Sequence, residues 1–171
     1  VENQPIDLSF LEFLLEDYFC KKVCEIADGD EKIVNIFGIQ ADFLNLQMIL
    51  RQKKYFDAPP DGIKARLLSL HSLFPRKKLE KLCESSVEEV ERFIDESKYS
   101  EYFKGAVSAD IAAGRAVRDI CRKTMRFDTS PSSVLSAYML LAKNQYDCLT
   151  TLVEGVRYNL ASDKITELLP I

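Results

Sequence analysis

The sequence is poor in the residues that most enzyme sites need. It has one histidine, His71, and no tryptophan. Its six glycines are scattered, so it contains no glycine-rich loop of the nucleotide-binding kind. The acid pairs Glu16-Asp17 and Glu88-Glu89 are adjacent in sequence and therefore point to different sides of a helix. With little available for acid–base chemistry near neutral pH, we expect no catalytic residue and no cofactor.

The cysteines also lack a pattern that would build a site. The sequence has no Cys-x-x-Cys pair, and its five cysteines are Cys20, Cys24, Cys83, Cys121 and Cys148. Cys20 and Cys24 share a helix face with Cβ atoms about 5–6 Å apart, too far for an unstrained disulfide. A metal would need two more ligands, which no motif supplies. We predict reduced, mostly buried thiols and no metal site. An enzyme that uses Cys20 or His71 is kept as a third hypothesis for the function, after the two that are given below.

Long apolar runs are missing as well. No run reaches the roughly 18–20 residues that span a bilayer, and we expect charge to interrupt the long helices every few positions. The acidic, polar start does not have the pattern of a signal peptide. We therefore predict a cytoplasmic protein without a transmembrane span. Because the first residue is Val1 and not Met, the chain is expected to be a piece of a longer protein.

Charge is present in blocks of alternating sign that sum to −4. The successive sums are −7 (1–50), +6 (51–82), −5 (83–102), +4 (103–126) and −2 (127–171). Such separation suits docking to charged protein partners, although ordinary solvated helix faces also explain it. Nucleic acid is not expected, because the Arg76-Lys77-Lys78 cluster is short and lacks interleaved aromatic residues.

Apolar residues recur at helical spacing along most of the chain, and no strand pattern is bounded by hairpin turns. We predict an all-α fold with long helices over about 9–27, 32–55, 102–125 and 132–158. A short helix should carry Ile63, Leu67 and Leu70, and Ser86-x-x-Glu89 predicts a capping box. Shorter elements should begin near residues 75 and 162. The chain should form a single domain (1–171) of two halves, about 1–82 and 83–171, because no linker composition separates them.

One pattern occurs twice, in Asp42–Tyr55 and again in Gln145–Tyr158. At an offset of 103 residues the aligned pairs are Phe43 and Tyr146, Leu46 and Leu149, Ile49 and Leu152, Lys54 and Arg157, and Tyr55 and Tyr158. After a polar break, Ile63 aligns with Ile165 at an offset of 102, so one residue is lost in the connection. The duplication predicts two helical repeat units, each a long helix, a loop and a short helix.

Both copies of the pattern end with a base followed by an aromatic residue. The candidate interaction surface consists of Arg51, Lys53, Lys54, Tyr55, Arg157 and Tyr158. Cations in the last turn of a helix also complement the helix dipole, which is worth about 0.3–1 kcal/mol, so a purely structural role stays open.

The stretch Asp42–Arg51 resembles the family of C subunits of archaeal- and vacuolar-type rotary ATPases, which are called d subunits in eukaryotic complexes. The similarity is an acid, then an Asn between apolar residues, then Leu-Arg. The closing stretch Leu149–Pro170 is similar to the family's C-terminal helix and its basic-aromatic end. Cys148 and Thr150 depart from the pattern, since the family usually shows an Asn and a base there.

The resemblance implies a non-catalytic central-stalk component of a proton- or sodium-translocating ATPase or ATP synthase. It would act as a rotor socket and couple the central-axle subunits to the membrane proteolipid ring, while lying peripheral to the membrane. The family fold is an all-helical funnel of three pseudo-equivalent units. The match covers about half of a family chain, which implies a fragment or a shortened relative. The alternative hypothesis is a helical-repeat scaffold or adaptor that binds a partner helix and is unrelated to ATPases.

An incomplete funnel should leave apolar surface uncovered. We expect this surface at the amino-terminal side, near Phe10, Phe13 and Leu14, and we expect it to promote self-association.

Overall fold

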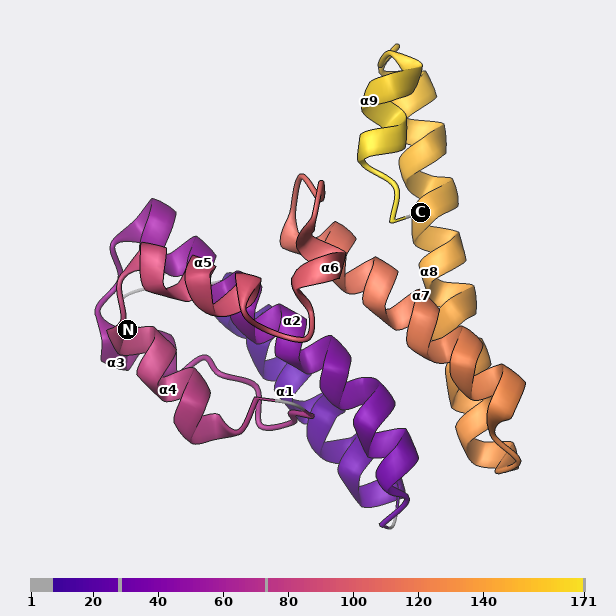
Figure 1. Ribbon diagram of the computed structural model, residues 1–171, viewed down its shortest axis with the longest axis horizontal. Coiled ribbons are helices and arrows are strands. Elements are labelled where there is room, and N and C mark those ends of the chain that lie inside the picture. The colour runs from indigo at the N-terminus through magenta and orange to yellow at the C-terminus, as the bar shows by residue number, and fades with distance from the viewer. Residues whose placement is uncertain (1–7, 28, 73, 171) are drawn as a thin grey trace, which may run out of the picture. The chain divides into compact units, whose positions relative to one another are not determined.

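The computed structural model describes residues 8–27, 29–72 and 74–170. Within those ranges it contains helices and no strand, which confirms the all-α class (Figure 1). The helices in chain order are α1 (Leu8–Ala27), α2 (Glu31–Phe56), α3 (Pro60–Lys64), α4 (Arg76–Glu84), α5 (Val87–Asp95), α6 (Ser100–Phe103), α7 (Ala109–Phe127), α8 (Pro131–Arg157) and α9 (Ser162–Glu167).

The chain divides into two compact units, which we call unit 1 (Val1–Glu84) and unit 2 (Ser85–Ile171). The division lies close to the boundary of the two predicted halves. The single domain and the arrangement of the repeats in a funnel stay predictions.

Unit 1 is built on a hairpin of α1 and α2, which pack along each other (Figure 1). Gly29 adopts the left-handed backbone conformation in the turn, with a φ of 84° that suits glycine. The Asp30 side chain then caps α2 by accepting hydrogen bonds from the amides of Lys32 and Ile33, at 3.0 and 3.4 Å.

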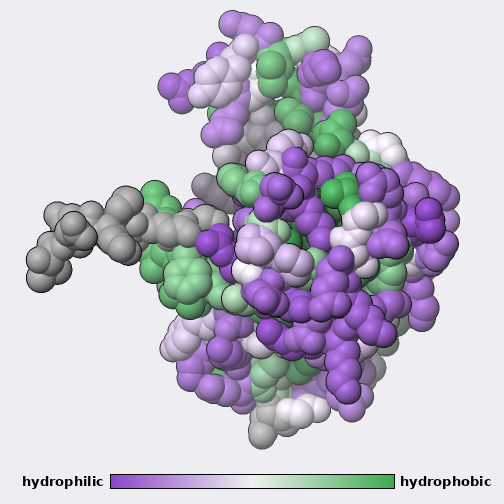
Figure 2. Space-filling model, turned by 90° about the vertical axis from the view of Figure 1, so that its left-hand side faces the viewer, coloured by the Kyte–Doolittle hydropathy of each residue, from purple (hydrophilic) through white to green (hydrophobic). Residues whose placement is uncertain are grey.

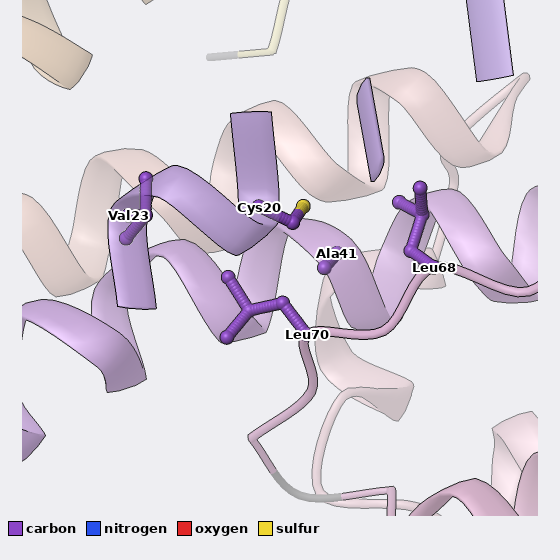
Figure 3. Close-up of a cluster of buried hydrophobic side chains, with 5 residues drawn as sticks. All are labelled: Cys20, Val23, Ala41, Leu68 and Leu70. Carbon is purple, nitrogen blue, oxygen red and sulfur yellow. The ribbon is translucent and has the colours of Figure 1, made fainter. Parts of the chain in front are cut away.

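A buried apolar cluster joins this hairpin to the segment that follows α3 (Figure 3). Its members are Cys20 and Val23 of α1, Ala41 of α2, and Leu68 and Leu70 of the following segment. The cluster fixes the segment between α3 and α4 (65–75) against the hairpin, and the described residues of this segment form no regular helix.

The predicted short helix with Ile63, Leu67 and Leu70 is wrong in its extent, because α3 ends at Lys64. The reason is that the following amides find other partners. Leu68 N–H donates to the Asn45 side chain at 2.8 Å, and Ser72 N–H donates to the Asp42 carboxylate at 3.3 Å. These bonds replace the carbonyl acceptors that a continued helix would offer.

Unit 2 begins with two short helices. The predicted capping box at the start of α5 is confirmed: the Ser86 hydroxyl accepts from the Glu89 amide, and the Glu89 carboxylate accepts from the Ser86 amide. The predicted helix over 102–125 is wrong at its start, because α6 ends at Phe103 and α7 begins only at Ala109. Gly105 lies in the break with a φ of 66°.

A hairpin of α7 and α8 forms the main body of unit 2, and α9 folds back along the end of α8 (Figure 1). Pro131 starts α8 at a position where a missing amide hydrogen costs nothing. The Asn144 side chain donates to the Gly114 carbonyl at 2.8 Å, and Arg118 donates to the Pro170 carbonyl at 2.7 Å. A Cβ atom at Gly114 would lie 2.6 Å from the Pro170 side chain, so this close approach requires glycine.

Helix α2 is more apolar than the sequence analysis expects. Only Asp42 is charged between Ile33 and Leu50, so the expectation that charge interrupts every long helix is wrong here. By length and composition α2 could cross a membrane, with a mean hydropathy of 1.4 over 18 residues, of which 50% are buried. The core helix of a folded unit passes the same test, so this is weak evidence. The absence of a span stays a prediction.

Candidate interaction site at the ends of the long helices

The last turns of α2 carry four of the six predicted site residues, and they have different environments. Tyr55 is 77% exposed, and the Arg51 guanidinium lies 5.9 Å from the centre of the Phe56 ring. Lys54 is exposed. Lys53 is half-buried, and its Nζ donates to the Cys83 carbonyl at 2.7 Å. Lys53 therefore ties α2 to the end of α4, whereas its three neighbours face solvent.

The end of α8 repeats the exposed part of this layout. Tyr158 is 69% exposed, and the Arg157 guanidinium lies 6.0 Å from the centre of its ring. A cation over an aromatic face is worth about 0.5–1 kcal/mol at an exposed site. Each helix end thus presents a base and an aromatic side chain to solvent. Since the two groups belong to different units, one shared surface stays a prediction.

The backbone that follows the two helix ends is closely similar. Asp57 and Asn159 are the two residues other than glycine with positive φ in the described part of the chain, at 45° and 54°. Two residues later, Pro59 has φ −64° and ψ 146°, and Ala161 has φ −61° and ψ 147°. Both pairs are related by the offset of 102 that aligns Ile63 with Ile165.

The short helices begin alike after these turns. The Ile63 amide donates to the Pro59 carbonyl at 3.2 Å, and the Ile165 amide donates to the Ala161 carbonyl at 3.1 Å. Both isoleucine side chains are buried. Each short helix therefore starts with the same hydrogen bond and turns an isoleucine inward.

The two turns differ because the second copy of the pattern is one residue shorter than the first. At the end of α8, Asn159 N–H donates to the Val156 carbonyl and Leu160 N–H to the Gly155 carbonyl, at 3.1 and 2.9 Å. This pair of bonds is a Schellman motif with asparagine in the left-handed position. At the end of α2, the amides of Asp57 and Ala58 both donate to the Gln52 carbonyl, which makes a wider turn. The extra residue of the first copy is accommodated there.

Three residues on one face of α2 hold the irregular segment that follows α3. Asp42 and Asn45 are the hydrogen-bond acceptors for Ser72 and Leu68 described above. One turn earlier, a Cβ atom at Gly38 would lie 2.9 Å from the His71 carbonyl group, so the segment touches the helix backbone there. The polar residues that carry the family resemblance in this stretch thus have a structural role.

The corresponding face of α8 lacks this arrangement. At the offset of 103, Gln145 and Cys148 replace Asp42 and Asn45. Gln145 is exposed, and the Cys148 thiol is 3.6 Å from the Asn144 side chain on the same helix. The departure at Cys148 therefore goes with a different way of holding the closing segment, which is bonded by Arg118 of α7 instead of by side chains of α8. Sequence reasoning names the departure but not this consequence.

Beside Arg51, a groove of about 490 Å³ lies between α1, α2 and the start of the 65–75 segment. Glu12 and Glu16 line one side, and Arg51 and Arg66 line the other. Apolar side chains such as Phe13, Leu44 and Met48 also line the groove, so its surface is mixed in character.

The remaining candidate chemistry is unfavourable for catalysis. Burial raises the pKa of the Cys20 thiol to about 11, with Asp17 and Glu16 adding to the shift, and burial alone raises the pKa of Cys121 to about 11. Such thiols stay protonated at neutral pH and are poor nucleophiles. His71 is exposed. No group of three metal-ligating side chains occurs among the residues described.

Comparison with protein families gives the context for these helix ends. A model of the family described as "ATP synthase (C/AC39) subunit" matches residues 1–168. The chain belongs to the ATP synthase (C/AC39) subunit family. Among curated proteins and among solved structures, no significant match was found.

Membership of the C/AC39 family confirms the resemblance drawn from Asp42–Arg51 and from the closing stretch. It also shows that an adaptor unrelated to ATPases is the wrong alternative. Both copies of the repeated pattern, with their basic and aromatic helix ends, lie inside the matched region.

Proposed function

We propose that this C/AC39 family member is a non-catalytic central-stalk subunit that couples the soluble axle of a rotary ATPase to its membrane proteolipid ring. The match of the family model over nearly the whole chain carries this proposal. The protein would work in the cytoplasm, peripheral to the membrane, and would neither span the membrane nor bind nucleic acid.

The exposed helix ends support a docking role. Arg51, Lys54 and Tyr55 in unit 1, and Arg157 and Tyr158 in unit 2, combine a charge with an aromatic ring that stands in solvent. Arg and Tyr are enriched among the residues that dominate protein interfaces. The alternating charge blocks add long-range steering toward partners of opposite charge.

The test is to mix the full chain with purified axle subunits, and separately with the purified proteolipid ring, at low and high salt. We expect a complex with each at low salt that weakens as salt screens the charges. Arg157→Glu should weaken the axle or the ring complex by about tenfold or more. Lys143→Glu is the matched control, because Lys143 lies on the same helix and is paired with Asp147 at 3.1 Å.

Absence of any complex at low salt would count against the coupling role. If the Arg157 and Lys143 variants changed the affinity for the partners equally, the coupling role would stand, but the end of α8 would not be part of the interface. Co-purification of a tagged chain with ATPase subunits from native membranes provides an independent readout.

A further inference from the structure

Helix α8 is apolar on two opposite sides, and unit 2 covers only one of them. Its buried residues, among them Ala137, Leu140 and Gly155, belong to the side that meets the rest of unit 2. Besides Tyr158, nine large apolar side chains between residues 135 and 160 are 42–69% exposed. A helix with apolar residues on opposite sides is expected to lie between two neighbours.

The exposed residues form one continuous stripe, which we call the α8 stripe. It repeats every seven residues, as in Met139, Tyr146 and Val153, with Leu149 and Val156 beside them, and Leu160 follows beyond the end of the helix. At 3.6 residues per turn, the eight side chains that belong to α8 fall within an arc of about 140°, roughly opposite the buried side. A seven-residue repeat of apolar positions is the pattern of a helix that packs against another helix.

The α8 stripe is large enough for a stable interface. A fully exposed large side chain offers roughly 150–250 Å², so nine half-exposed ones present on the order of 1,000 Å². A standard interface buries about 800 Å² per partner, and the largest apolar patch of a typical monomer is about 300–600 Å². Hydrophilic side chains cover much of the face visible in Figure 2.

The charges around the stripe favour a second copy as its partner. Gln145 lies inside the arc and Arg157 at its edge, while Lys143, Asp147 and Glu154 lie on a flank. Because Arg157 stands at one end of the helix, two copies of the stripe can face each other antiparallel without opposing like charges.

The other exposed apolar face of the chain is less suited to self-pairing. On α1 it includes Leu11 and Leu15, and acids outnumber bases beside it, with Glu12 and Glu16 on one flank and Glu25 ion-paired with Lys22. Two copies of that face would bring together the excess of acids in the −7 block.

We propose that two copies of this chain associate through the α8 stripe, so that their α7–α8 hairpins form a four-helix bundle. Twofold pairing of one patch with itself is the commonest way in which homo-oligomers form. The inference concerns the chain on its own and does not rest on the coupling role proposed above. It moves the expected self-association from the amino-terminal side to α8.

The test is sedimentation equilibrium of the full chain over about 1–200 μM, a range that covers ordinary micromolar affinities. We expect a monomer–dimer equilibrium. Leu149→Glu and Val153→Glu should each raise the dimer dissociation constant by roughly 30-fold or more, as hot-spot substitutions do. Leu15→Glu is the matched control on α1, since Leu15 and Leu149 are 62% and 61% exposed. It should leave the dimer unchanged.

Three results would overturn the proposal. A monomer over the whole range would rule out a second copy as the partner of the stripe. A dimer lost in Leu15→Glu and kept in both α8 variants would place the interface on α1. Loss of the dimer in both kinds of variant would indicate a head-to-tail contact of α1 with α8. All substitutions are at exposed positions, and thermal unfolding of each variant checks that it is folded.

Discussion

Leu46 in unit 1 and Leu149 in unit 2 occupy aligned positions of the repeated pattern but have opposite environments. Leu46 is 0% exposed and Leu149 is 61% exposed. Phe43 and Tyr146, and Ile49 and Leu152, differ in the same way. The backbone after the two helices is nevertheless closely similar. The comparison teaches that apolar residues at helical spacing identify a helix face that packs against a partner. The spacing does not tell whether that partner belongs to the same chain.

The largest expected effect comes from truncating the two leucines. Leu46→Ala should lower the free energy of unfolding by about 2–5 kcal/mol, because it leaves a cavity in a packed core. Leu149→Ala in the monomer should change it by less than about 0.5 kcal/mol. Chemical denaturation at low protein concentration measures both. Similar losses would show that the α8 stripe is covered within the monomer, and the comparison would fail.

A smaller effect is expected from the side chains that hold the irregular segment. Asn45→Ala removes the acceptor of the buried Leu68 amide and should cost about 1–3 kcal/mol. Cys148→Ala at the aligned position should cost less than about 0.5 kcal/mol, since no backbone amide depends on it. Thermal unfolding of both variants decides the matter. A neutral Asn45→Ala would mean that the segment is held by its apolar contacts alone.

The smallest effect concerns acid pH. Burial alone would raise the pKa of Asp17, but hydrogen bonds from Lys21 and Ser69 outweigh it and lower the pKa. The stabilisation from Asp17 is therefore present above its unfolded pKa of about 3.9 and is lost as the pH falls through the lower folded value. Asp17→Asn should cost about 1 kcal/mol at neutral pH and make unfolding less acid-sensitive. An unchanged acid transition in the variant would contradict this origin.

The sequence predicts the helices well because most of them depend on local signals. Ser86 and Glu89 form the predicted capping box, and Pro131 marks the start of α8 within one residue of expectation. Errors occur where long-range partners decide. The helix expected to include Leu67 and Leu70 stops early, because α2 supplies acceptors from more than twenty residues away. No local pattern contains that information.

The candidate site is only partly accessible to sequence reasoning. The sequence identifies the basic and aromatic residues at the helix ends, but it does not show that Lys53 differs from its neighbours. In the structure, the Lys53 Nζ donates a hydrogen bond to the Cys83 carbonyl, whereas its neighbours face solvent. On the expected amino-terminal apolar face, Phe10 and Leu14 are indeed exposed, while Phe13 packs against the core. The α8 stripe escapes prediction because its residues have the same spacing as a core face. Separating the two requires knowing which side α7 occupies.

The hydrogen bonds from Ser69 to Asp17 join residues that are 52 positions apart, across the whole of α2. Helix α1, which carries the acceptor Asp17, must already be packed on α2 before these bonds can form. Closing so long a loop also costs conformational entropy that only later contacts offset. The 65–75 segment is therefore expected to dock late in folding and to leave early in unfolding. In this order of events, the hairpin of α1 and α2 forms first and serves as a template, and docking of the segment completes the folding of unit 1.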